Sequence, residues 1–206
     1  MIDIVDYGVG NLFSLISSLN FIGARAEIVS DPSELKKADK IILPGVGAFK
    51  DAALKLKNSG MWDAVTDAAN SGVPLLGICL GMQLLFEKSY EFGEYEGLSL
   101  INGSVRPLSD IVPKEYKIPQ MGWNSLRFTG EKSPLFKYIN EGDYVYFVHS
   151  FYASECESSV IAGTHYGAFV TAAVSKNNVF GCQFHPEKSG ETGLNILRAF
   201  CEEAFL

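Results

Sequence analysis

The chain has 206 residues, of which 47% are hydrophobic and 20% are charged, and this composition excludes a mainly disordered protein. A chain of this length buries a core that needs no disulfide or metal crosslinks. The formal net charge of −7 at pH 7 repels phosphate backbones and anionic lipids, so we expect no nucleic-acid or membrane partner. No apolar run reaches the roughly 18–20 residues of a membrane-spanning helix, and the acidic N-terminus lacks the basic stretch of a signal peptide, which predicts a cytoplasmic protein.

The first half of the chain alternates short apolar strands with helical stretches. Strands are predicted over residues 2–7, 26–29, 40–43 and 73–79. The first helical stretch runs from Leu12 to a stop at Gly23, and a second starts after a cap at Ser30 or Asp31. A third follows residues 44–47, is broken at Gly60 and resumes over residues 61–70, and a fourth covers residues 80–86. This alternation predicts a parallel sheet with helices on its faces, in which the apolar segment 73–79 is a central strand.

The second half changes character. From Leu98 to Phe184 the pattern is one of short strands and turns, and the segments 169–175 and 179–184 are predicted to form a hairpin. A last helix is predicted over residues 191–206, with an apolar stripe made of Leu194, Leu197, Cys201, Ala204 and Phe205. We therefore predict one α/β domain over residues 1–206, with a central, mostly parallel sheet flanked by helices and a β-rich second half.

The strongest local signal is Gly-Ile-Cys-Leu-Gly at residues 77–81, where the apolar strand meets a helix. This pattern is typical of the sharp turn that presents a nucleophile at the end of a strand, with Cys79 as the nucleophile. The start of the following helix favours a thiolate, and the backbone N–H of Leu80 is placed to stabilise an oxyanion. The pentapeptide alone is equally compatible with a buried structural cysteine between two packing glycines.

A nucleophilic thiol needs a base, and His185-Pro186-Glu187 supplies the best candidate. Proline favours an extended residue before it, and residues two apart in an extended chain point to the same side. Glu187 can therefore orient the imidazole of His185, although a surface histidine beside a solvated glutamate would have the same sequence. The four cysteines and three histidines have no zinc-site spacing, so we expect no metal and no cofactor.

Pro-Gly-Val-Gly at residues 44–47 follows the third predicted strand. Two glycines around one residue allow the backbone to turn its N–H groups inward, next to the strand that carries the nucleophile. We expect a second oxyanion donor there, while an ordinary strand-to-helix turn is the simpler interpretation of this segment alone.

Together, the cysteine turn and the distant His-Pro-Glu segment resemble the triad class of glutamine amidotransferases. Four separated segments narrow the resemblance to the glutaminase subunits of imidazole glycerol phosphate synthase: residues 5–12, 44–49, 119–124 and 185–189. The resemblance extends along the whole chain and departs from the family at no triad position. It implies the class I glutamine amidotransferase fold.

The resemblance also implies a role for each site residue. Cys79 would attack the side-chain amide of glutamine and form a thioester, His185 would move the protons, and Glu187 would hold His185. The backbone N–H groups of Val46 and Leu80 would form the oxyanion hole. Glutamine would be bound by Gly47, Gln83, Ser150 and Phe151.

By the same resemblance, the ammonia passes to a barrel-shaped synthase subunit in a heterodimer. That partner converts a phosphoribulosyl aminoimidazole carboxamide nucleotide (PRFAR) to imidazole glycerol phosphate and a purine precursor (AICAR), in histidine biosynthesis. Interface candidates are Asn11, Trp123, Asn124 and Lys188, although Trp123 could also be a core aromatic. Two other interpretations stay open: another cysteine hydrolase on the same fold that acts alone, and a non-catalytic module that organises a partner.

Overall fold

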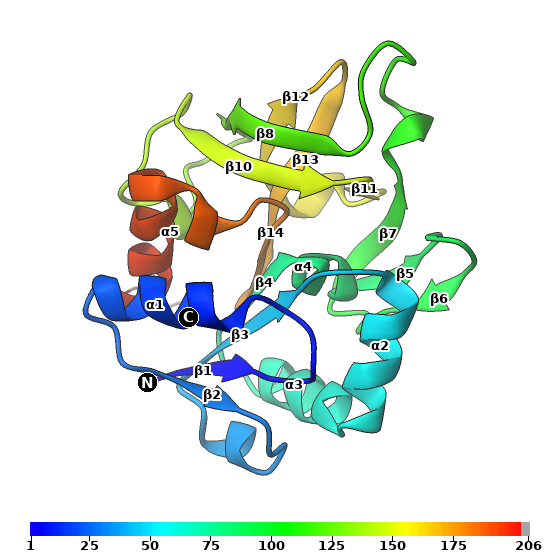
Figure 1. The fold of residues 1–206 in the computed structure, drawn as a ribbon. Coiled ribbons are helices and arrows are strands. Elements are labelled where there is room, and N and C mark those ends of the chain that lie inside the picture. Colours follow the sequence, from blue (N-terminus) through cyan, green and yellow to red (C-terminus); the bar gives the residue numbers. More distant parts are fainter. Residues whose placement is uncertain (203–206) are drawn as a thin grey trace.

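The computed structural model describes residues 1–202, which form three sheets with helices packed around the largest of them (Figure 1). The strands are β1 (Ile2–Val5), β2 (Ala26–Val29), β3 (Lys40–Gly45), β4 (Leu75–Cys79), β5 (Phe86–Ser89), β6 (Tyr95–Glu96), β7 (Ile101–Pro107), β8 (Gln120–Ser125), β9 (Arg127–Phe128), β10 (Tyr144–His149), β11 (Phe151–Ser154), β12 (Val160–His165), β13 (Phe169–Lys176) and β14 (Val179–Cys182). The α-helices are α1 (Leu12–Phe21), α2 (Phe49–Asn58), α3 (Met61–Asn70), α4 (Leu80–Leu84) and α5 (Gly190–Glu202). Two residues of the predicted last stripe, Ala204 and Phe205, lie outside the described residues.

The largest sheet has eight strands in the order β2-β1-β3-β4-β14-β13-β12-β9. The strands from β2 to β14 are parallel, and the pairings from β14 to β9 are antiparallel. The predicted mostly parallel sheet with a β-rich second half is therefore confirmed, including the β13–β14 hairpin. Because strands of both halves share this sheet, it supports the prediction of one domain.

The sheet is buried on both faces, as the nearly continuous burial along its parallel strands β1, β3 and β4 shows. On one face, Ile41 and Leu43 of β3 belong to a core cluster with residues of α2 and α3. On the other face, Ile42 of β3 belongs to a second cluster with residues of α1 and α5. The helices among the described residues are too short or too polar to cross a membrane.

Two predicted helices are wrong in extent. The segment after Asp31 forms only a single 3₁₀ turn, Glu34–Lys37, because the Asp31 carboxylate accepts the N–H of Ser33 and only one side chain of the turn is buried. The helix after Cys79 ends at Leu84, two residues before β5 begins, because the backbone of a later segment hydrogen-bonds to the last carbonyl of the helix. The backbone N–H of Leu98 donates to the carbonyl of Leu84 at 2.7 Å.

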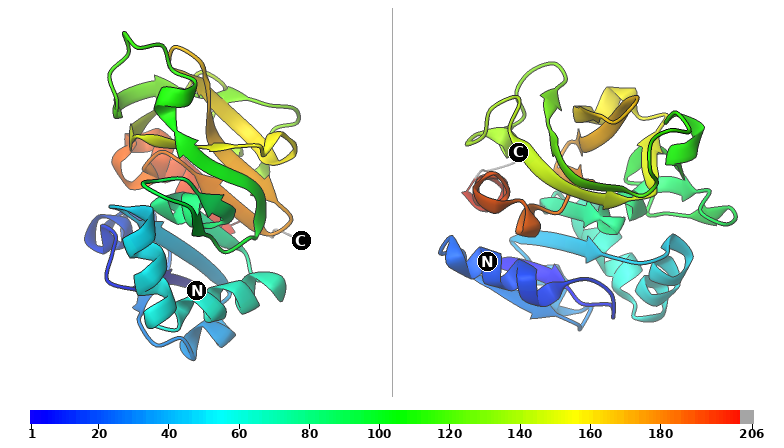
Figure 2. Two further views of the ribbon diagram at one scale, coloured as in Figure 1. Left: turned by 90° about the vertical axis from the view of Figure 1, so that its right-hand side faces the viewer. Right: turned by 45° about the horizontal axis from the view of Figure 1, so that its top comes forward.

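The smaller sheets belong to the second half of the chain. Strands β8 and β10 form an antiparallel pair, and the third sheet has the order β11-β7-β5-β6. Figure 2 shows the β8–β10 ribbon, green and yellow, curving over the same side of the molecule as the end of β3. The ends of β3, β4 and β10 meet around one cleft, so the topology gathers residues far apart in the sequence.

Candidate active site

Cys79 lies at a strained turn between β4 and α4. Its φ of 54° and ψ of −108° fall where non-glycine residues rarely lie, and such strain is typical of a nucleophile held at a tight turn. A Cβ on Gly81 would lie 1.8 Å from the carbonyl oxygen of Leu43, and one on Gly77 would lie 2.7 Å from that of Gly81. Both glycines are therefore required by close backbone packing, as the sequence predicts.

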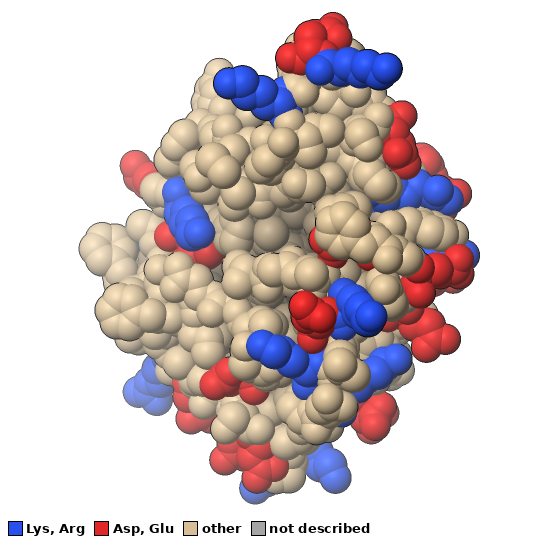
Figure 3. All heavy atoms as spheres, turned by 45° about the vertical axis from the view of Figure 1, so that its right-hand side comes forward, with Lys and Arg blue, Asp and Glu red and all other residues tan. Residues whose placement is uncertain are grey.

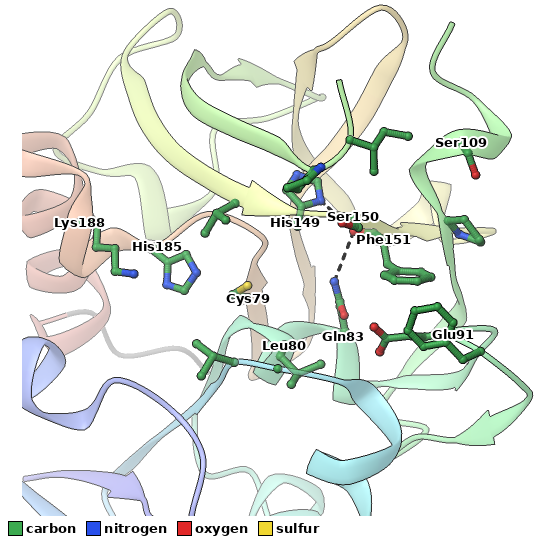
Figure 4. Close-up of a pocket in the computed structure, with 17 residues that line it drawn as sticks. Cys79, Leu80, Gln83, Glu91, Ser109, His149, Ser150, Phe151, His185 and Lys188 are labelled. Atoms are coloured by element: carbon green, nitrogen blue, oxygen red, sulfur yellow. Dashed lines mark hydrogen bonds between the residues drawn. The ribbon is translucent and has the colours of Figure 1, made fainter. Parts of the chain in front are cut away.

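His185 and Glu187 approach Cys79 from the neighbouring strand. β14 pairs with β4 in parallel register, Cys182 opposite Ile78, so the chain leaving β14 passes beside the nucleophile. The Nδ1 atom of His185 lies 2.8 Å from Oε1 of Glu187, and both side chains are almost completely buried. In Figure 4 the imidazole lies beside the sulfur of Cys79. The structure brings the three predicted triad residues together.

The surroundings of His185 stabilise its charged form. Burial disfavours the charge, but hydrogen bonds with Cys79 and Glu187 outweigh burial and raise the pKa of His185 to about 9. Because Nδ1 is occupied by Glu187, Nε2 is the nitrogen that can exchange a proton with the thiol. At neutral pH this arrangement favours the charged imidazolium form of His185, next to the sulfur of Cys79.

The triad opens into a cleft of 610 Å³ between the end of the large sheet and the β-rich half. Figure 3 shows a hollow bordered mainly by uncharged residues. The predicted site residues that line the cleft are Val46, Gly47, Cys79, Leu80, Gln83, Ser150, Phe151, His185 and Lys188. The volume suits a small-molecule ligand. Within residues 1–202, no group of His, Cys, Asp and Glu side chains is arranged to hold a metal ion.

Gln83 is fixed by two hydrogen bonds. Its Nε2 donates to the backbone carbonyl of Phe151 at 3.3 Å and to Oε1 of Gln183 at 3.0 Å. Both amide hydrogens are thus used within the protein, which leaves Oε1 of Gln83 to accept a hydrogen bond from a ligand. Gln83 points from α4 towards Phe151 across the cleft in Figure 4.

The loop at residues 44–47 is held by Tyr7, which the motif analysis did not assign to the site. The Tyr7 hydroxyl donates to the carbonyl of Pro44 at 2.8 Å. Burial, together with the nearby Cys79, raises the pKa of Tyr7, so the phenol stays a neutral donor. The contact fixes the backbone directly before Val46, the predicted oxyanion donor. The periodicity of the first strand, which ends at Val5, carries no signal for this role.

Glu91 also lines the cleft and was missed by the sequence analysis. Its carboxylate accepts the backbone N–H of Phe49, the first residue of α2. Burial raises the pKa of Glu91, the Phe49 N–H opposes this shift, and the charge of Asp51 adds to it. Glu91 follows the short strand β5 in a segment, residues 87–97, for which the sequence analysis predicted no element, so no motif marked it.

His149 is 6% exposed and lies at the end of β10. Its Nδ1 lies 2.8 Å from the carbonyl oxygen of Phe151, so the neutral ring donates there and accepts at Nε2. Nε2 of His149 faces the side-chain amide of Gln120, whose nitrogen has no other partner. With the amide turned so that its NH₂ faces the ring, this NH₂ donates to Nε2 of His149. Burial lowers the pKa of His149 to about 4, the Phe151 carbonyl opposes this, and His185 adds to it. These contacts pack His149 against the first residue of β11.

This lowered pKa predicts a pH-dependent stability. In the unfolded chain His149 has its ordinary pKa of about 6.5, and in the folded protein its pKa is about 4. Between these two pH values the unfolded chain therefore binds a proton that the folded protein does not. The free energy of unfolding should therefore fall as pH falls through this window, by about 2 kcal/mol between pH 6.5 and pH 5. Urea unfolding at pH 7 and pH 5 measures the loss, and His149→Leu should reduce it by that amount.

His165→Gln, which removes an exposed histidine, is the matched control for this measurement. It should retain the wild-type dependence on pH. An equal loss in the wild type and in His149→Leu would show that other groups cause the dependence.

Among the interface candidates Lys188 lines the cleft, whereas Asn11, Trp123 and Asn124 are not among its lining residues and face different ways. Trp123 is 53% exposed, so it is not a core residue, and Met121 beside it on the same face of β8 is 63% exposed. Asn124 points to the opposite face and donates to the carbonyl of His165 at 3.3 Å. Asn11 caps α1 by accepting the N–H of Ser14. Their predicted contacts with a partner stay predictions.

The cysteine at a strained strand-to-helix turn and the buried His–Glu pair beside it have the arrangement of a Cys-His-Glu triad, the kind of site found in enzymes that use a cysteine nucleophile. The family model "Glutamine amidotransferase class-I" matches residues 3–204. The chain is 52% identical to imidazole glycerol phosphate synthase subunit HisH of Wolinella succinogenes over 98% of this chain and 99% of that protein. It is also 52% identical to the same subunit of Caldanaerobacter subterraneus subsp. tengcongensis, over 98% of each chain.

Solved structures support the fold alone. A crystal structure of a glutamine amidotransferase superposes with a TM-score of 0.76 at 18% identity and covers 98% of both chains. The PurLQS structure from Thermotoga maritima gives a TM-score of 0.73 at 19% identity, covering 97% of this chain and 96% of that one. The chain belongs to the class I glutamine amidotransferase family, in the group of the HisH subunits of imidazole glycerol phosphate synthase. The family, the fold class and the glutaminase function expected from the sequence are confirmed.

Proposed function

We propose that Cys79, His185 and Glu187 carry out the hydrolysis of glutamine to glutamate and ammonia. The single observation that carries the proposal is the buried His185–Glu187 pair, at 2.8 Å, beside a cysteine held at a strained turn. The sulfur of Cys79 attacks the amide carbon of the substrate side chain. His185 holds the thiol proton and gives a proton to the leaving ammonia. It then takes a proton from the water that cleaves the thioester.

The oxyanion that forms on attack is stabilised by backbone N–H groups. Leu80 is the first residue of α4, so its N–H has no partner within the helix. Val46 lines the cleft at the end of the loop that Tyr7 holds. Each such donor lowers the barrier by about 2.7–4 kcal/mol.

An amino-acid substrate also needs recognition at its other end. Glu91 presents a carboxylate to the cleft, and an α-ammonium group is the complementary charge. Oxygen Oε1 of Gln83 can accept an N–H of the substrate amide, while Gly47, Ser150 and Phe151 line the cleft around it. The cleft therefore has groups suited to a primary amide and to an ammonium.

The ammonia is consumed by a barrel-shaped synthase subunit bound as a heterodimer, which makes imidazole glycerol phosphate and AICAR from PRFAR. The exposed Met121 and Trp123 on β8, with Lys188 at the mouth of the cleft, support a docking face there. Unprotonated ammonia is the nucleophile required, so a partner that covers the cleft and excludes water suits the chemistry. We also propose one domain over residues 1–206 and a cytoplasmic location.

The test is glutamate release from glutamine by the purified chain, alone and with the synthase subunit and its nucleotide ligand. Release that depends on Cys79 and rises with the loaded partner supports the proposal. Hydrolysis of peptides without the partner would favour a hydrolase that acts alone. No release in a folded complex would favour a module that only organises its partner.

In the same assay, Glu91→Gln should raise the KM for glutamine about tenfold or more with a smaller change in kcat. The reason is that the variant removes the charge that faces the substrate ammonium without touching the triad. Glu94→Gln is the matched control, because it removes a largely exposed carboxylate from a surface ion pair with Lys88. An unchanged KM for Glu91→Gln would show that Glu91 only caps α2.

A further inference from the structure

The sulfur of Cys79 has a second polar neighbour besides His185. The side-chain nitrogen Nε2 of Gln183 lies 3.7 Å from Sγ of Cys79, within hydrogen-bonding range for sulfur. Gln183 follows β14 directly and is completely buried. Its backbone N–H donates to the carbonyl of Ala172 at 2.8 Å, which anchors the residue to β13. No step of the hydrolysis described above uses this side chain.

The orientation of the Gln183 amide, that is, which of its ends faces Cys79, is set by a backbone carbonyl, which can only accept hydrogen bonds. The backbone carbonyl of Phe151 can only accept, so the group that Gln83 presents to it must be its NH₂. The same nitrogen of Gln83 donates to Gln183, so Gln183 must present its oxygen to Gln83. The NH₂ of Gln183 is therefore the end that faces Cys79. Turning this amide over would set two donors against each other at Gln83 and an oxygen against the sulfur.

The charges around Cys79 make this donor important. The titratable groups that interact with Cys79 include His185, Tyr7 and Cys182. Burial raises the pKa of both Tyr7 and Cys182, so at neutral pH both are uncharged. His185 is then the charged partner of a thiolate, and it lies on one side of the sulfur. A neutral N–H donor also stabilises negative charge there, and it adds no competing proton acceptor.

We propose that Gln183 is a catalytic residue that donates an N–H to the Cys79 sulfur, stabilising the thiolate and fixing its direction of attack, with its polarity imposed by the Phe151 carbonyl through Gln83. This inference rests on the proposed role of Cys79 as the nucleophile. The thiol proton goes to His185, as in the mechanism above, and Gln183 keeps both of its protons throughout.

The experiment measures the rate at which iodoacetamide alkylates Cys79 in the purified full chain, from pH 5 to pH 10. Mass spectrometry of the Cys79 peptide separates this site from the other three cysteines. Gln183→Met keeps the length of the side chain but removes the donor. It should move the midpoint of the profile up by about one pH unit and lower the rate at pH 7 about tenfold. Gln183→Glu keeps the shape and the bond from Gln83 but turns an oxygen to the sulfur, so its rate at pH 7 should fall further.

Two further variants exclude a merely structural effect. Asn178→Leu removes a part-buried amide at the other end of β14, which donates to the carbonyls of Ala69 and Val73. It should lower the thermal stability and leave the profile unchanged. Gln83→Met frees the amide of Gln183 to rotate, so it should slow alkylation by a reagent that needs no glutamine site. Its effect should not add to that of Gln183→Met.

The outcomes separate this inference from the proposed function. A slow wild-type alkylation with an ordinary thiol profile would overturn the nucleophile itself. A rapid wild-type alkylation with the same profile in Gln183→Met and Gln183→Glu would overturn only the role of Gln183. Additive effects of the Gln83 and Gln183 variants would show that Gln83 does not set the polarity of the amide.

Discussion

Cys79→Ala should reduce glutamine-dependent synthesis by the assembled enzyme at least about 10⁴-fold, because loss of the nucleophile removes the thioester route entirely. Synthesis from ammonium salts should stay near the wild-type rate, since ammonia supplied from solution needs no triad. The substitution removes one sulfur atom at a position that is 8% exposed, so the fold should tolerate it. The measurement is product formation with glutamine and, separately, with ammonium ions.

Cys201→Ala provides the control, because this cysteine lies on α5 away from the cleft. It should keep both activities. A collapse of the ammonium-dependent rate in Cys79→Ala would reveal a structural role for the thiol. Glutamine use that survives the substitution would remove the thioester mechanism.

Glu187→Gln should lower kcat for glutamine hydrolysis about 10³-fold or more with little change in KM. One carboxylate oxygen accepts from Nδ1 of His185, and the other, Oε2, is buried without a partner. A glutamine amide must either place its NH₂ in that unpartnered position or turn it towards Nδ1. The second arrangement forces the ring proton onto Nε2, so the imidazole can no longer take the thiol proton.

Glu191→Gln, in the first turn of α5, is the matched control and should leave kcat unchanged. The alkylation profile of Cys79 gives an independent readout for Glu187→Gln. It should shift to higher pH, because a neutral imidazole stabilises the thiolate less. A normal kcat would mean that sheet packing alone orients His185.

Much of the site could be predicted because its chemistry requires particular residues at particular turns. Gly77 and Gly81 flank the nucleophile for a steric reason, since a Cβ at either position would meet backbone atoms. The parallel order of the first strands follows from their alternation with helices. Cys79 and His185, paired in the sequence analysis as nucleophile and base, then meet because β4 and β14 are neighbours, which the strand pattern did not predict.

Other parts depend on contacts that no local pattern records. Glu91 and Tyr7 act through partners 42 and 37 residues away, Phe49 and Pro44. The helix expected after Asp31 is absent because the aspartate side chain competes for a backbone N–H. The role of Gln183 depends on the orientation of two amides, which only the three-dimensional hydrogen-bond chain determines.

The place of β14 in the large sheet has a consequence for the nascent chain. This strand lies between β4 and β13, yet it is synthesised about a hundred residues after the nucleophile strand that it joins. Until it is inserted, the buried apolar strand β4 has an open edge and Cys79 has neither its base nor Gln183. A ribosome-bound or truncated chain without β14 should therefore be prone to pair with other strands and should lack glutaminase activity. Hydrolysis of glutamine by the proposed triad therefore requires β14 in its place between β4 and β13.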